Sequence, residues 1–332
     1  MNFQKYETEL GEGTLNKDRK RRRNIVINFV SFGEVLIDFI SKDYVKGLKN
    51  ATSFEKFLGG SPSNIAVNIA KQGFKSAVIS RLGRDPFGDF ILEQLNNYNV
   101  DVRGISQDER FHTDIVYVLK SKSSPEFYPL RSASLNLDIA ETYFDIVKKA
   151  NIFHFSSWAL SSDKNLKNTL RLLKVAKKNN VLIGFDPNYR EILWKTSLEI
   201  GDVLRLVMPY VDFIKPSLDD CVHIFKENKN EEEYINIFHE WGVKNVLLTL
   251  GEKGFIFSDG KTITHFDSYA KEVIDTTGAG DAFWSGLYIG TIIGMDVIKA
   301  ARLGNAFSAE KLKYVGAICN IKNYKELLKE YL

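Results

Sequence analysis

The sequence predicts an α/β fold in which a mainly parallel central sheet carries helices on both faces. The first observation behind this prediction is the regular alternation of short apolar runs with longer amphipathic segments, which is clearest after residue 140. Repeated strand–helix units place strands side by side and parallel, with helices covering both faces. The second observation is size, because 332 residues with 44% hydrophobic content can bury one large core. We therefore expect one large domain over residues 25–332.

The individual elements follow from local patterns along the chain. Residues 25–32 form an apolar, β-branched run that ends at Gly33, which is typical of a buried strand. The turn at 59–64 leads into an apolar helix that ends at Gly73. Further strands are expected at 77–82, 152–155, 181–185, 213–215 and 246–249, with a hairpin at 254–257 and 262–265. One helix is expected to end at residue 97, and a short helix is expected after Ser217. Four more are expected at 140–150, 166–179, 197–207 and 231–241.

Two regions interrupt this alternation. Residues 36–58 contain two short mixed segments separated by a polar stretch, which favours exposed strands over a crossover helix. Residues 113–119 and 126–131 have the pattern of a hairpin with a polar turn. We therefore predict a small sheet, built from about 36–58 and 112–131, that stands off the main domain as a lid.

Composition excludes several classes of protein. Much of the net charge of +3 lies in the basic run at 17–23, so we expect residues 1–24 to form a mobile extension and the rest to have no general affinity for nucleic acid. No apolar run is long enough to span a membrane, and no secretory signal is expected. Cys221 and Cys319 show neither a paired nor a metal-binding spacing, which favours a reducing, cytoplasmic compartment.

The segment at 275–283 is the strongest candidate functional site. Gly278, Ala279 and Gly280 precede a long apolar helix, so the backbone N–H groups at the helix start are open to an anion. A glycine-rich turn that only caps a core helix would explain the small residues but not Asp281. A carboxylate beside an anion site suits the proton acceptor of a phosphoryl transfer. Small residues recur along the helix at 282, 286, 290 and 294, which predicts close approach of another backbone or of a nucleotide.

Two separated stretches resemble the signatures of the PfkB, or ribokinase-like, family of carbohydrate kinases. They are Gly59-Gly60-x-Pro62-x-Asn64, with Gly73 and Gly83 after it, and Asp275-Thr276-Thr277-Gly278-Ala279-Gly280-Asp281. The resemblance implies a ribokinase-like three-layer α/β/α domain with a small β-sheet lid. It also implies transfer of the γ-phosphoryl group of ATP to a sugar hydroxyl, with Mg²⁺ as cofactor. Asp281 would accept the hydroxyl proton, and the backbone amides of 278–281 would hold the developing charge.

The resemblance also assigns roles to other residues. Those expected to contact the sugar are Asp38, Gly60, Asn64, Tyr128 and Arg131 on the lid hairpin, and Arg190 after a buried strand. Those expected near the nucleotide are Thr249, Gly251, Gly254 and Asn305. Asp275 and Thr277, with the backbone of 309–316, resemble a monovalent-cation site for K⁺. Ser217 and Asp220 replace the usual Asn-x-x-Glu of the family, so Asp220 is expected in the Mg²⁺ shell with metal affinity left open. Simpler readings also exist: a helix cap for Asn64, an ion pair for Arg190 and a β-turn for glycines 251 and 254.

Within the family, residues 60–64 and 186–194 are most similar to fructokinases, so we expect D-fructose as substrate and fructose 6-phosphate as product. The second motif also occurs in 2-keto-3-deoxygluconate kinases, which would need a cation such as Arg131 or Arg190 at the substrate carboxylate. A nucleoside kinase is less favoured because no aromatic slot for a base is evident. A kinase-like protein that binds a sugar or a partner without catalysis would be expected to lack Asp281 or the anion site. The resemblance also implies that a homodimer can form through the lid, although exposed strand edges can be protected within a monomer as well.

Overall fold

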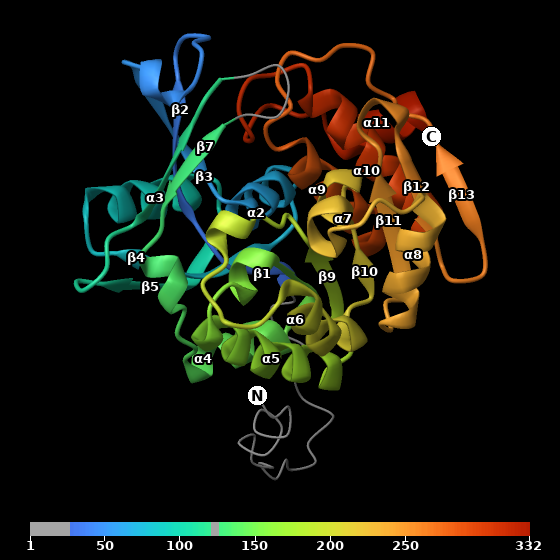
Figure 1. Ribbon diagram of the computed structural model, residues 1–332, viewed down its shortest axis with the longest axis horizontal. Coiled ribbons are helices and arrows are strands. Elements are labelled where there is room, and N and C mark those ends of the chain that lie inside the picture. The colour runs from blue at the N-terminus through green and yellow to red at the C-terminus, as the bar shows by residue number, and fades with distance from the viewer. Residues whose placement is uncertain (1–26, 121–125) are drawn as a thin grey trace.

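A computed structural model describes residues 27–120 and 126–332, and the predicted parallel α/β architecture is confirmed. Within these residues the main sheet has the order β13-β12-β11-β10-β9-β8-β1-β4-β5 (Figure 1). Neighbouring strands are parallel except at one edge, where β12 pairs in an antiparallel manner with both β11 and β13. The strands are β1 (Ile27–Phe32), β4 (Ser76–Gly83), β5 (Asp101–Asp108), β8 (Ala150–Ser156), β9 (Leu182–Asp186), β10 (Phe213–Ile214), β11 (Asn245–Thr249), β12 (Phe255–Ser258) and β13 (Ile263–Phe266).

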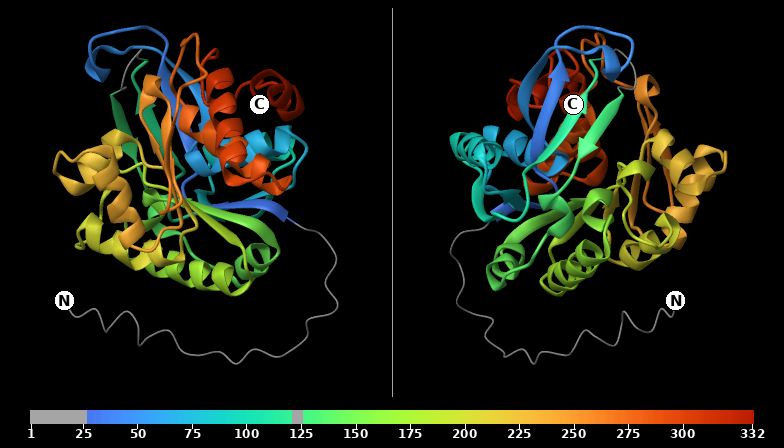
Figure 2. Two further views of the ribbon diagram at one scale, coloured as in Figure 1. Left: turned by 90° about the vertical axis from the view of Figure 1, so that its right-hand side faces the viewer. Right: turned by 60° about the vertical axis from the view of Figure 1, so that its left-hand side comes forward.

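The helices form one layer on each face of this sheet (Figure 2). Two separate apolar clusters fill the space between the sheet and the two layers. The first layer contains α4 (Glu141–Lys148), α5 (Asp163–Lys178), α6 (Ile200–Val207), α7 (Leu218–Phe225) and α8 (Glu231–Glu240). The second contains α2 (Ser61–Lys71), α3 (Pro86–Asn97), α9 (Ala279–Ile292), α10 (Val297–Lys311) and α11 (Tyr324–Tyr331). The chain therefore has three layers, as expected.

The predicted lid is also present as a separate sheet with the order β3-β2-β6-β7, which stands off the main sheet in Figure 1. Its strands are β2 (Leu36–Ser41), β3 (Phe54–Gly59), β6 (Asp114–Val118) and β7 (Phe127–Leu130). β6 and β7 form the expected antiparallel hairpin, and β2 joins β6 in parallel. Leu36 and Val116 of the lid pack with Trp158 and Leu193 of the main domain. This small apolar cluster anchors the lid to the segments that follow the central strands β8 and β9.

The sequence patterns do not predict the strand β5 or the helix α11. β5 is an edge strand whose sequence, DVRGISQD, lacks both an apolar run and strict alternation, so its pairing with β4 decides its structure. In α11 only Leu327 is fully buried, and the short helix depends on packing against α10. The predicted extension at residues 1–24 lies outside the described residues, as do the first two residues of the predicted first strand.

The small residues of α9 allow the backbone of α10 to approach closely. A Cβ atom on Gly286 would lie 2.6 Å from the carbonyl oxygen of Leu303, and one on Gly290 would lie 2.7 Å from the Cα atom of Ala300. Glycine inside a helix costs about 1 kcal/mol relative to alanine, and this close packing compensates for it. The small residues were predicted to allow close approach of another backbone or of a nucleotide. The structure shows the first, because the backbone of α10 packs against them.

Two expectations from composition concern membranes and cysteines. Among residues 27–120 and 126–332, no helix is both long enough and apolar enough to cross a membrane. Both cysteines are free, with Cys221 buried and Cys319 half-buried. Burial raises the pKa of the Cys221 thiol, so it acts as a small apolar core group rather than as a nucleophile.

Candidate active site

The candidate site lies where the carboxyl ends of the central strands meet the N-termini of α2 and α9. Open parallel sheets bind their ligands at this edge. Asp281, in the first turn of α9, accepts a hydrogen bond of 2.6 Å from Ser61 Oγ and one of 2.8 Å from Asn64 Nδ2. Both donors belong to the first turns of α2. They fix the orientation of the Asp281 carboxyl group and leave it further acceptor capacity for a substrate hydroxyl.

Asn64 is not a helix cap, because Gly60 occupies the N-cap position of α2. That simpler reading is wrong. The Oδ1 atom of Asn64 is buried and has no hydrogen-bond partner among the described residues. Leaving a buried acceptor unpaired costs about 1–3 kcal/mol, which a ligand hydroxyl could recover. Gly60 beside it has a φ of 96°, and a Cβ atom there would stand 2.5 Å from the carbonyl oxygen of Glu34, so only glycine fits.

The start of α9 leaves backbone N–H groups open to an anion. The N-cap residue is Gly278, with a φ of 78°, and no side chain caps the helix. The Ala279 N–H donates to Thr276 O at 3.1 Å, and the first intrahelical bond runs from Ala282 N–H to Gly278 O. The N–H groups of Gly280 and Asp281 precede that bond and have no acceptor within the helix. The predicted anion site therefore centres on the amides of 280–281, because the Ala279 amide is already used.

Lys215 brings a positive charge to this helix start. It follows β10, and its side chain is only 6% exposed. Its Nζ atom lies 3.6 Å from Asp186 Oδ2, and a Cβ atom on Gly280 would lie 3.3 Å from the same nitrogen. Asp186 also accepts a 2.9 Å hydrogen bond from Trp284 Nε1 of α9. The ammonium group is thus held directly beside the open amides, where a phosphoryl group would carry negative charge.

The carboxyl groups around this point have raised pKa values. Burial, with a smaller effect of the Asp281 charge, raises the pKa of Asp38 to about 7. Burial raises the pKa of Asp186 to about 6, although the Lys215 charge opposes this shift. Burial also raises the pKa of Asp281, while the hydrogen bonds from Ser61 and Asn64 oppose it. A carboxylate whose pKa is moved towards neutrality is a better general base than an ordinary aspartate.

Replacing Ser61 by alanine is expected to move the acid limb of the pH profile of kcat/KM to higher pH. The Ser61 hydroxyl donates to the ionised form of Asp281 and so lowers its pKa. Without it Asp281 ionises only at higher pH, and we expect the acid limb to move in the same direction. The profile is measured from pH 5 to 9, with Ser63→Ala as control, because Ser63 Oγ donates to backbone carbonyls instead. An acid limb that stays in place or moves down would contradict this coupling.

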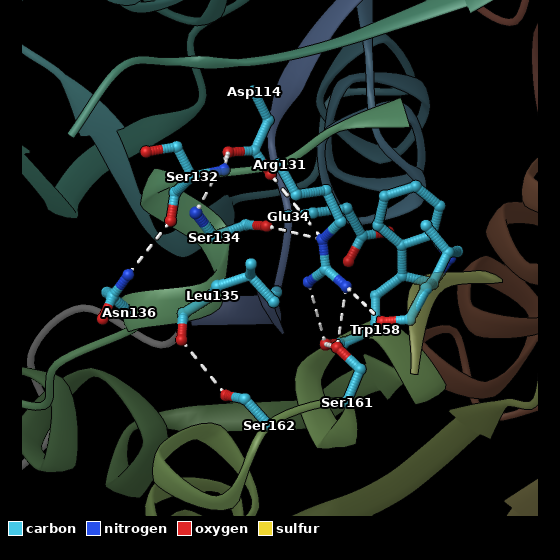
Figure 3. A network of polar contacts seen from close by, with 12 residues as sticks. Glu34, Asp114, Arg131, Ser132, Ser134, Leu135, Asn136, Trp158, Ser161 and Ser162 are labelled. Atoms are coloured by element: carbon cyan, nitrogen blue, oxygen red, sulfur yellow. Dashed lines mark hydrogen bonds and ion pairs between the residues drawn. The ribbon is translucent and has the colours of Figure 1, made fainter. Parts of the chain in front are cut away.

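Arg131 binds the lid to the main domain (Figure 3). Its side chain is 4% exposed, and each of its three nitrogens donates to the protein. The acceptors are Ser134 Oγ, Ser161 Oγ, and the carbonyl oxygens of Trp158 and Leu193. Asp114 lies 3.9 Å from its Nε atom and stacking on the Trp158 ring adds a cation–π contact. These contacts use most of the donors of Arg131 and leave little for a bound sugar.

Replacing Glu34 by glutamine is expected to flatten the dependence of stability on pH. Glu34 is fully buried beside Arg131 and Asp114, and burial raises its pKa to about 8. In the folded state the Glu34 carboxyl therefore keeps its proton over a pH range in which the unfolded chain has released it. The stability that protonated Glu34 contributes is full below the unfolded pKa and is lost as pH rises through about 8. A wild-type Tm that falls by at least about 2–4 °C between pH 6 and 9 is expected. The Tm of E34Q should fall less over this range, whereas the Tm of Glu93→Gln, which changes an exposed residue, should follow the wild type. The same change of Tm with pH in all three proteins would contradict a protonated Glu34.

Arg190 and Asp220 contact each other at the carboxyl end of β9. Arg190 is 41% exposed, and its Nη1 atom donates to Tyr189 O at 2.7 Å and lies 3.5 Å from Asp220 Oδ1. Asp220 also accepts from Tyr189 N–H and, through Oδ2, from the N–H and Oγ of Ser217. These contacts fill the acceptor capacity of a carboxylate. The ion-pair reading of Arg190 is therefore present in the structure, and a part for Asp220 in a Mg²⁺ shell stays a prediction.

The residues expected near the nucleotide lie at the end of β11, in the turn into β12 and on α10. Thr249 ends β11 and donates to Pro216 O, and Gly251 and Gly254 form the turn into β12. The β-turn reading of both glycines is thus present as well. Asn305 of α10 donates to Asp267 O at 2.8 Å, which holds the loop after β13. On the lid, Tyr128 is 55% exposed on β7. Contact of these residues with ligands stays a prediction.

No group of three or more His, Cys, Asp or Glu side chains suited to a metal ion is present among residues 27–120 and 126–332. At nucleotide sites Mg²⁺ is typically held by one or two carboxylates together with substrate phosphates and water. The expected monovalent-cation site is different. The Nζ atom of Lys311 donates to the carbonyl oxygen of Asp275 at 2.6 Å and to that of Tyr314 at 3.2 Å. The residues predicted to hold K⁺ therefore surround an ammonium group of the chain itself.

Four residues of this site carry no predicted role. Ser61 follows Gly60, and Glu34 follows Gly33 at the end of the predicted first strand. Lys215 directly precedes the Pro-Ser-x-x-Asp segment, and Lys311 lies within the 309–316 segment predicted to bind K⁺. A lysine at the end of an apolar strand is the one available signal, since Lys215 directly follows Phe213 and Ile214. The other three depend on contacts between distant segments.

An aspartate, open helix-start amides and a buried lysine meet at the carboxyl edge of a parallel sheet, an arrangement that suits the transfer of a phosphoryl group. Comparison with known proteins specifies the class. The model of the pfkB family of carbohydrate kinases matches residues 27–323, and the chain belongs to this family. The enzymatic and ribokinase-like fold predictions are thereby confirmed.

Three relatives illustrate the range of the family around this chain. An ATP-dependent 6-phosphofructokinase of Thermoanaerobacterium thermosaccharolyticum is 37% identical over 91% of this chain and 93% of its own length. The fructokinase structure of Halothermothrix orenii is similar with a TM-score of 0.75 and 35% identity, covering 88% of this chain and 100% of that one. A double mutant of Vibrio cholerae fructokinase, bound to fructose, ADP and potassium ion, has a TM-score of 0.76 and 25% identity, covering 93% and 100%.

Proposed function

We propose that this sugar kinase is an ATP-dependent fructokinase that forms fructose 6-phosphate from D-fructose. The observation that carries the proposal is the Asp281 carboxylate, held by Ser61 and Asn64 beside the open amides of α9. The sugar oxygen forms a bond to the γ-phosphorus, the bond from that phosphorus to the bridging oxygen of ADP breaks, and the hydroxyl proton passes to Asp281. The amide of Gly280 and the Lys215 ammonium stabilise the charge on the transferred group. Mg²⁺ on the nucleotide would neutralise phosphate charge.

The preference for a neutral sugar is supported by the contacts of Arg131, one of the two arginines considered for a substrate carboxylate. A 2-keto-3-deoxygluconate kinase needs a positive group for the substrate carboxylate. Arg131 donates hydrogen bonds to Ser134, Ser161 and two main-chain carbonyls. The site offers instead the unpaired Oδ1 atom of Asn64 and the Asp38 carboxyl, which suit hydroxyl groups. Two of the relatives named above are fructokinases, which agrees with this reasoning.

The test is a comparison of acceptors with MgATP under identical conditions. ADP release is measured with D-fructose, 2-keto-3-deoxygluconate, fructose 6-phosphate and adenosine. We expect kcat/KM to be highest for D-fructose by about tenfold or more, since each 1.4 kcal/mol of selective binding gives that factor. A tenfold preference for the keto acid would move the assignment to that substrate. The products are identified by mass spectrometry and by their phosphate position.

Fructose 6-phosphate is included because a 37% identical relative is named a 6-phosphofructokinase. A preference for it would require a cationic site for the second phosphate and would replace the proposal. A protein that binds sugar without catalysis would release no ADP with any acceptor, although its Tm would rise with the sugar it binds. The proposed homodimer through the lid edges β3 and β7 is tested separately by the molar mass in solution.

A further inference from the structure

We propose that Lys311 is a built-in cation that takes the place of K⁺, so that this kinase works without a monovalent metal ion. The inference rests on the proposed phosphoryl transfer for one of its readouts only. A potassium ion is bound in the Vibrio cholerae fructokinase structure, and Asp275 and Thr277 with the 309–316 backbone are the residues predicted to hold one here. The geometry of these residues points to an internal ammonium instead.

The oxygen cage around the Lys311 ammonium is complete enough to define a cation site. Lys311 has no exposed side-chain surface, and its Nζ atom donates to Asp275 O and Tyr314 O. The Asp275 carboxylate lies 3.7 Å away through Oδ2. Two carbonyl oxygens and one carboxylate are hard oxygen ligands of the kind that alkali-metal ions bind. A substituted ammonium has the same single charge as K⁺ and a similar size, so the two cannot occupy this position together.

The carboxylate of Asp275 shows why the charge is needed. Its Oδ1 atom accepts from the N–H and Oγ of Thr277, and Oδ2 accepts from Gly316 N–H at 2.7 Å. These contacts suit a carboxylate, and holding its negative charge largely out of water, with the side chain 15% exposed, would be costly without a cation. Burial lowers the pKa of the Lys311 ammonium, and the Asp275 charge opposes this effect. The lysine and the carboxylate therefore neutralise each other inside the protein.

This pair is connected to the anion site through short stretches of backbone. Asp275 leads through Thr277 into Gly278, the N-cap of α9. On the other side, Gly316 leads into Ala317, which packs so closely on Gly278 that a Cβ atom there would lie 2.6 Å from the Ala317 Cα atom. The Lys311 charge also lowers the pKa of Asp281. Lys311 is thus a positioning residue: it holds both segments that shape the start of α9.

The experiment compares the wild type with two Lys311 variants in buffers that differ only in containing K⁺ or choline, with Tris as the buffer cation in both. For the wild type we expect activity and Tm to be the same in both buffers, within about twofold in rate. Lys311→Ala opens the cage, so its kcat should fall by about 10- to 100-fold in choline and recover with K⁺ or NH₄⁺. Its Tm should also rise with K⁺. Lys311→Met fills the space without a charge, so K⁺ should restore neither its rate nor its Tm.

The outcomes separate the cation proposal from the proposed function. A wild-type enzyme activated several-fold by K⁺ would overturn the proposal without any variant. A Lys311→Ala protein whose Tm and rate ignore K⁺ would do the same. Lys71→Ala is the matched control, because Lys71 Nζ also donates to a carbonyl oxygen, that of Cys319, but lies outside the cage; K⁺ should not rescue it. If no sugar is phosphorylated at all, the Tm measurements still decide whether Lys311→Ala has gained a K⁺ site.

Discussion

Replacing Asp281 by asparagine is expected to lower kcat by about 100- to 10,000-fold while leaving the fold intact. Asparagine has nearly the same shape, and its carbonyl oxygen can still accept from Ser61 Oγ or Asn64 Nδ2. It cannot take the proton of the sugar hydroxyl. The loss should therefore appear in kcat and kcat/KM together, which marks an interaction made in the transition state. The measurement is steady-state ADP formation with D-fructose and MgATP.

The control for this change is Asp219→Asn, an exposed aspartate on α7 that lies close in sequence to the site but outside it. It should retain the wild-type rate. Titration calorimetry should show that D281N still binds ATP, since the amide of Gly280 and the Lys215 ammonium remain. A D281N protein that keeps more than about a tenth of the wild-type kcat would show that Asp281 is not the base.

The sequence was sufficient for those parts of the fold that depend on local pattern. Apolar runs predicted most strands of the main sheet, and the break in alternation predicted the lid strands β2, β3, β6 and β7. β5 was missed because its DVRGISQD sequence has no apolar run, and only pairing with β4 makes it a strand. Glycines with positive φ, such as Gly60 and Gly278, were informative because their backbone conformation strongly favours this residue.

The arrangement of the candidate site depends on contacts between segments that lie far apart in the sequence. Ser61 and Asp281 are 220 positions apart in the chain and meet only after α2 and α9 pack together. The internal contacts of Arg131 could not be predicted for the same reason, because these hydrogen-bond partners lie on the segments that follow β8 and β9. A sequence shows that an arginine is present on the lid. It does not show that the protein itself uses the donors.

Lys215 is the second residue whose replacement should strongly impair the reaction. Lys215→Met keeps most of the buried volume and the contact with the Trp284 ring but removes the charge beside Gly280. Loss of one electrostatic contact to the developing charge typically costs about 100- to 1,000-fold in kcat, and we expect a loss of this size. The exposed Lys174→Met on α5 is the control for the general effect of losing one lysine. A decrease of less than about tenfold would contradict a direct role in the transfer.

A double-mutant cycle with Asp186→Asn separates a direct role of Lys215 from an indirect one. Asp186 Oδ2 lies 3.6 Å from the ammonium, so K215M also leaves a buried carboxyl without its cation and raises its pKa further. If Lys215 acts only by holding Asp186, then K215M should cost almost nothing in the D186N background. If the ammonium acts on the phosphoryl group, the loss in kcat should persist there at about its full size, with a coupling energy below about 0.5 kcal/mol. We expect the second result, because the nitrogen lies next to the open helix start as well as next to the carboxylate.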